Sequence, residues 1–74
     1  MSKKMGFTAW LKEQHHRDDP VGELARDMRE DKEWPHRARH RGLRSYLENR
    51  GAIGRALQAL DDAYTEWGTL PPIV

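Results

Sequence analysis

The feature that most constrains this chain is an apolar stripe near its C-terminal end. From residue 53 to residue 67 the apolar positions recur every three or four residues, as they do along one face of an α-helix. They are Ile53, Ala56, Leu57, Leu60, Ala63, Tyr64 and Trp67. The stripe predicts a helix over residues 52–67 that ends at Gly68. We interpret Gly54, inside this stretch, as a site where another helix approaches closely.

A second helix is indicated by Asp19-Pro20. A residue that precedes proline avoids the α region, and proline is well placed at the first helical position, where its missing N–H is not needed. Asp19 is therefore expected as the N-cap. An apolar stripe follows, made of Val21, Leu24, Ala25 and Met28. This helix should end before Trp34-Pro35.

Two further helices are predicted over residues 7–15 and 39–49, from apolar spacing that starts at Phe7 and at Leu43. Gly51 should end the later one in a left-handed conformation. No stretch alternates apolar and polar residues as a strand would. The fold class predicted is all-α, a compact four-helix bundle in which each helix neighbours the next. Its expected core is Phe7, Trp10, Leu11, Leu24, Met28, Trp34, Leu43, Leu47, Leu57, Leu60 and Tyr64.

The length of 74 residues allows one small domain. We expect a flexible N-terminus over residues 1–6, the helical domain over 7–67 and an extended tail over 68–74. The chain has no cysteine, which excludes a disulfide scaffold and fits a reducing compartment. It also lacks an apolar run of about 18 residues and the pattern of a signal peptide. These features favour a cytoplasmic protein without a membrane span.

The near-neutral net charge of +1 conceals a gradient along the chain. Residues 34–50 hold five basic groups and one acidic group, whereas residues 1–33 hold seven basic and eight acidic groups. The basic block contains Arg37, Arg39, Arg41 and Arg44 without any acid between them. Because the planar guanidinium suits phosphate and carboxylate, these four arginines are candidate binding residues.

Three interpretations of this block stay open: a solvated helix face, a surface that binds a protein, and a surface that binds nucleic acid. The second helix is acidic, so the two surfaces could dock head to tail between copies of the chain. They could equally face each other within one molecule. Asp27 and Asp31 are the candidate binding residues on the acidic helix.

No pattern of residues indicates catalysis. His36 and His40 have a helical metal-binding spacing, but the surrounding arginines disfavour a cation. Asp27 and Asp31 could form an acid–base pair, although Arg26, Arg29 and Lys32 interleave and favour ion pairing instead. No phosphate-binding loop is present, and a bundle this small has little room for a pocket of roughly 300 Å³. We therefore expect no enzyme, metal, cofactor or small-molecule substrate.

Trp34 stands beside the basic block, where an aromatic ring could stack on a nucleic-acid base. A tryptophan before proline at a helix junction is also a natural core residue. A domain with so few leucines and isoleucines needs its rings inside, so we expect Trp34 in the core.

The ordered set of motifs resembles the YozE SAM-like family, small bacterial proteins whose four-helix fold is likened to the sterile alpha motif. The resemblance covers roughly residues 7–67. It rests on Phe7-x-x-Trp10-Leu11, Asp19-Pro20-Val21-Gly22-x-Leu24-Ala25-x-Asp27, Asp31-x-x-Trp34-Pro35, Tyr46-Leu47 and Ala63-Tyr64-x-x-Trp67. Trp34 stands where the family tends to have phenylalanine, and Tyr64 and Trp67 are exchanged.

What the resemblance implies is a fold more than a function. It supplies no catalytic residues, and domains of this kind bind proteins, self-associate or bind nucleic acid. We therefore expect a protein-interaction module that can self-associate through its acidic second helix and its basic segment. The alternative is nucleic-acid binding through residues 36–44.

Overall fold

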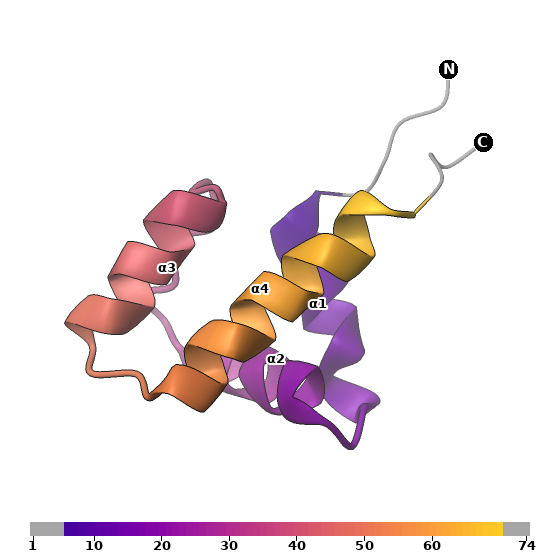
Figure 1. Ribbon diagram of the computed structural model, residues 1–74, viewed down its shortest axis with the longest axis horizontal. Helices are drawn as coiled ribbons and strands as arrows, with labels where there is room; N and C mark the ends of the chain where they lie inside the picture. Colours follow the sequence, from indigo (N-terminus) through magenta and orange to yellow (C-terminus); the bar gives the residue numbers. More distant parts are fainter. Residues whose placement is uncertain (1–5, 71–74) are drawn as a thin grey trace.

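A computed structural model describes residues 6–70 as four α-helices and one short 3₁₀ helix. No strand occurs within this range, so the predicted all-α four-helix fold is confirmed. Figure 1 shows α4 in the middle of the domain, with α3 beside it and α1 and α2 on its other side. The elements are α1 (Phe7–Glu13), η1 (Gln14–His16), α2 (Pro20–Glu30), α3 (His40–Asn49) and α4 (Gly54–Gly68).

The start of α2 confirms the predicted cap. Asp19 is the N-cap, its carboxylate accepts from the backbone N–H of Gly22 at 2.9 Å, and Pro20 opens the helix. The guanidinium of Arg17 joins this corner to α4, because it contacts Asp19 at 2.8 Å and Glu66 at 2.9 Å. The two ion pairs hold the beginning of α2 beside the end of α4.

The helix predicted over residues 7–15 is shorter than expected. The α-helical part ends at Glu13, and the chain continues through the 3₁₀ turn η1. A 3₁₀ turn is a common ending because it satisfies the last carbonyls of a helix. The amide of Gln14 donates to the carbonyl of Trp10 at 3.0 Å and covers one of those groups.

The connection between α3 and α4 confirms one prediction and corrects two. Gly51 has a φ of +80°, the left-handed conformation expected of a residue that ends a helix. However, α4 begins at Gly54, and Ile53 is its N-cap with 69% of its surface exposed. Ile53 is therefore not part of the buried stripe. A Cβ on Gly54 would meet no atom within 4 Å, so no helix approaches closely there.

The core lies where α1, α2 and α4 meet, and it extends to α3 through Leu43. Trp34 is buried in it, with 4% of its surface exposed, as predicted. Trp10, Leu47 and Tyr64 pack against the core but stay partly exposed, and Leu57 is also only half-buried. The buried hydrophobic residues are Phe7, Leu11, Val21, Leu24, Ala25, Met28, Trp34, Leu43, Ala59, Leu60 and Ala63.

Consecutive helices are not all neighbours. No Cα of α2 comes within 8 Å of a Cα of α3, so the prediction that each helix neighbours the next is wrong for this pair. The segment between them, which contains Trp34, fills the space and lets α3 pack on α4 instead. Gly68 is the last residue of α4, and the rest of the predicted tail beyond Leu70 lies outside the described residues.

Candidate binding surface

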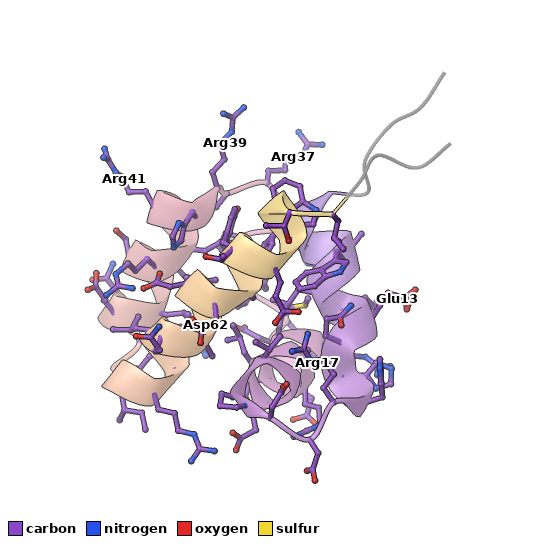
Figure 2. All side chains as sticks on the ribbon, turned by 45° about the vertical axis from the view of Figure 1, so that its right-hand side comes forward. Glu13, Arg17, Arg37, Arg39, Arg41 and Asp62 are labelled. Carbon is purple, nitrogen blue, oxygen red and sulfur yellow. The ribbon has the colours of Figure 1, made fainter. Side chains whose placement is uncertain are left out.

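Three of the four candidate arginines lie together at one end of the molecule. Figure 2 shows Arg37, Arg39 and Arg41 pointing away from the helices on the same side. This is the end at which α3 begins, and α2 lies at the other end of the view in Figure 1. All three side chains are exposed, and none makes an ion pair with another described residue. With Lys12 of α1, we call these residues the basic end.

Arg44 differs from the other arginines because it has an internal partner. Its guanidinium lies 2.6 Å from the carboxylate of Asp61 on α4, and Nε2 of His40 lies 2.6 Å from the other oxygen of the same carboxylate. The hydrogen bond from His40, aided by Arg44, lowers the pKa of Asp61. Arg44 therefore ties α3 to α4, and we leave it out of the basic end.

An open groove runs between α1, the segment 36–39 and the end of α4. Its volume is about 580 Å³, larger than the roughly 300 Å³ for which we expected little room. The ring of Phe7 is stacked on Tyr64 with centroids 3.8 Å apart, and Trp67 meets Phe7 edge-on at 5.9 Å. The hydroxyl of Thr8 donates to the carbonyl of His36 at 3.3 Å and links the two walls.

Charge around this groove has one sign. Its lining is Gly6, Phe7, Thr8, Ala9, Lys12, His36, Arg37, Ala38, Arg39, Tyr64 and Trp67. Three of these side chains are cations and none is a carboxylate. We call this feature the aromatic groove, since it combines aromatic walls with a basic rim. Such a groove suits an apolar side chain flanked by acids.

The two candidate aspartates do not form a common site. Asp31 accepts hydrogen bonds from the hydroxyl of Tyr46 and from the backbone N–H of Glu33, and Arg50 lies 3.9 Å away. The bond from Tyr46 is the main cause that lowers the pKa of Asp31. Asp27 is exposed and makes no ion pair with a described residue. Asp31 is thus held in place by three contacts, whereas Asp27 has no such contact with residues 6–70.

The interleaved cations do not pair with these aspartates as the sequence suggested. Arg26 instead donates to the carbonyls of His15 and Arg17, at 2.7 and 3.0 Å. It therefore caps the turn that precedes α2. No ion pair of Arg29 or Lys32 is found within residues 6–70.

Comparison with known proteins agrees with this architecture. The family model described as YozE SAM-like fold matches residues 6–68. The chain belongs to the YozE SAM-like family. Neither a search of curated proteins nor a search of solved structures found a significant match. The family description names a fold and no activity, so the basic end and the aromatic groove carry the functional argument.

The sequence of this YozE SAM-like protein did not reveal every residue of the basic end and the aromatic groove. Lys12 was not singled out, because it is distant in sequence from the basic block. Trp67 was placed on the apolar stripe of the last helix but not singled out as a binding residue, and it is only partly buried and lines the groove. The one available signal was its position at the last turn of α4, where a helix leaves its packed environment. No helix in the described part of the chain is long and apolar enough to cross a membrane.

Proposed function

We propose that this protein is a non-enzymatic protein-interaction module whose basic end and aromatic groove bind an acidic polypeptide surface. The observation that carries the proposal is the pairing of aromatic walls with cations that form no ion pair with another described residue. Arg37 and Arg39 line the groove, and Arg41 lies close by on the first turn of α3. Aromatic residues and arginine are enriched in protein interfaces, where they dominate binding energy.

A protein partner fits the overall charge better than nucleic acid does. The pI is 8.2, whereas nucleic-acid-binding domains are often above about 9. Three arginines and one lysine without an ion pair in residues 6–70 would contact few phosphates. The groove also offers Phe7, Tyr64 and Trp67 to an apolar side chain. A phosphate backbone has no such group to insert.

Absence of catalysis is part of the proposal. The groove lining contains no carboxylate that could act as a partner in acid–base chemistry. The histidine that does contact a carboxylate, His40, shares Asp61 with Arg44 and is stacked on Tyr64 with centroids 4.5 Å apart. These contacts support a structural role for His40. We place the protein in the bacterial cytoplasm, in keeping with its lack of cysteine.

Nucleic-acid binding is the second candidate because Arg37, Arg39 and Arg41 project to the same side (Figure 2). Each phosphate contact contributes about 0.9 to the salt slope on duplex DNA. Loss of two arginines should then reduce that slope by about 2. A change of this size in the salt slope distinguishes nucleic-acid binding from protein binding, because it requires contacts to a phosphate backbone.

A binding titration followed by fluorescence anisotropy tests both candidates. The probes are a labelled glutamate-rich peptide with one central isoleucine and a labelled DNA duplex. The proposal expects peptide binding that Arg37→Ala/Arg39→Ala weakens by about tenfold. Arg29→Ala, an exposed arginine on α2, is the matched control and should bind like the wild type. Equal loss in the control contradicts the proposal, and tighter binding of DNA with the altered salt slope favours the alternative.

A further inference from the structure

Ile53 occupies a position that neither the core nor helix capping explains. It is the N-cap of α4, where Ser, Thr, Asp or Asn is normally preferred, and it makes no capping bond through its side chain. Its side chain is 69% exposed, the greatest exposure of any large hydrophobic residue in the described range. A single exposed hydrophobic residue is common on protein surfaces, so the surroundings decide its meaning.

The surroundings of Ile53 are apolar with an acidic edge. Ile53 lines a groove of about 230 Å³ together with Pro20, Leu24, Asp27 and Ala56, a set we call the Ile53 surface. The nearby cation Arg55 is neutralised by Glu23 at 2.7 Å. Arg50, which lines an adjoining groove with Ile53, lies 3.9 Å from Asp31 and over the ring of Tyr46. Of the charged residues around Ile53 in the described chain, Asp27 is the one without an ion pair.

The Ile53 surface and the aromatic groove lie at opposite ends of α4. Ile53 precedes the helix and Trp67 is in its last turn, fourteen residues later. At about 1.5 Å per residue, this separation is about 21 Å along the helix. The two surfaces therefore cannot meet within one chain. Among residues 6–70, no ion pair links the basic end to α2.

We infer that the acidic partner of the basic end is a second copy of this chain. Ile53 enters the aromatic groove of the neighbouring copy, and Asp27 lies near the rim formed by Lys12, Arg37 and Arg39. This inference rests on the proposed function, because it names the partner of the same groove. The negative charge of Asp27 complements the positive rim of the groove. The net charge of the chain is only +1, so repulsion between copies is weak.

The geometry also defines the kind of assembly. Each copy uses two different surfaces, so the contact is heterologous and leaves one free surface at either end. We therefore expect chains or rings that grow with concentration, rather than closed dimers. Salt weakens them, because the charges at the rim are exposed and are screened over about 10 Å at 0.1 M.

A mixing experiment with two blocked variants tests this inference. Ile53→Lys removes the apolar side chain and adds a cation, whereas Arg37→Glu/Arg39→Glu reverses the rim of the groove. Each change weakens self-association by about tenfold or more. In sedimentation velocity at up to about 1 mM protein, a range that reveals weak association, the wild type should form a concentration-dependent series. Each variant alone should be a monomer, and their equimolar mixture should form dimers and nothing larger.

Controls make every outcome decisive. Ile53→Leu should retain association, and Arg29→Glu, which changes charge on α2, should behave as the wild type. A monomeric wild type, a mixture that stays monomeric, or a single blocked variant that still associates overturns the inference. If the wild type is monomeric but binds the glutamate-rich peptide at its groove, only the second copy is excluded. If it also fails to bind the peptide, the proposed function is excluded as well.

Discussion

The hydroxyl of Tyr46 donates a hydrogen bond to the carboxylate of Asp31, and so α3 is joined to the end of α2 although their backbones lie apart. Asp31 is the C-cap of α2 and also accepts from the backbone N–H of Glu33. The contact spans the segment that contains Trp34, whose ring meets that of Tyr46 edge-on at 6.0 Å. Asp31 is consequently a structural residue, although its sequence position made it a candidate for binding.

Replacement of Tyr46 by phenylalanine should therefore destabilise the domain, because Asp31 loses the strongest of its partners. Asp31→Asn should have a similar effect, and the double variant should cost little more than either single change, since both remove the same contact. Asp27→Asn serves as the control and should leave the melting temperature unchanged. Thermal unfolding followed by circular dichroism measures all four variants. Additive losses in the double variant would show that the two groups act independently.

The N-cap of α2 predicts that the adjacent residues Asp18 and Asp19 contribute differently to stability. Asp19→Ala removes the acceptor for Gly22 and one partner of Arg17, whereas Asp18 is exposed and makes no bond with a described residue. Loss of one N-cap from a domain of this size lowers the melting temperature by about 4–8 °C. Asp18→Ala should lower it by much less. Equal shifts in a thermal scan would contradict the assigned cap.

Two glycines should respond to alanine in opposite ways. A Cβ on Gly22 would lie 2.0 Å from the carbonyl oxygen of Arg17, so the turn before α2 would have to move. Gly22→Ala should cost about 1–3 kcal/mol or more, as overpacking does. Gly54 has open space around it, and Gly54→Ala should stabilise the domain by about 0.4–1 kcal/mol. Urea denaturation gives both free energies, and a stable Gly22→Ala variant would refute the packing described.

The stability of the domain should fall in acid. The pKa values of Asp19, Asp31 and Asp61 lie below their ordinary value, chiefly because of hydrogen bonds from the Gly22 backbone, Tyr46 and His40 respectively. The unfolded chain then binds protons more readily, so stability rises with pH in this range. The contribution is complete above about pH 5 and is lost as pH falls through the lowered pKa values. Melting temperatures from pH 7 to pH 2 measure this decline, and a flat profile below about pH 4 would contradict it.

The sequence predicted the local features of the fold and missed those that depend on distant contacts. The predictions from Asp19-Pro20 and Gly51 were correct because each depends only on backbone within a few residues in the sequence. Ile53 was placed in the buried stripe because helical periodicity does not mark where the first turn begins. The acidic partner of Arg44 was missed because Asp61 is seventeen residues away on another helix.

The candidate surface shows the same limit. The run of arginines identified the basic end, but charge counting does not reveal which cations have internal partners. The aromatic groove required α1 and the end of α4 to meet, which the spacing of Phe7 and Trp67 in sequence does not show. Exposure of Ile53 likewise follows from the position of α4 against α2.

The most direct test of the central claim is an amide NMR titration of the wild-type protein with the glutamate-rich peptide. It is performed at about 50 and 200 mM salt, because screening weakens contacts between exposed charges across this range. We predict shifts at Thr8, Lys12, residues 36–41 and the indole N–H of Trp67, all of which decrease at the higher salt. Absence of shifts at these positions, or shifts confined to α2, would contradict the account.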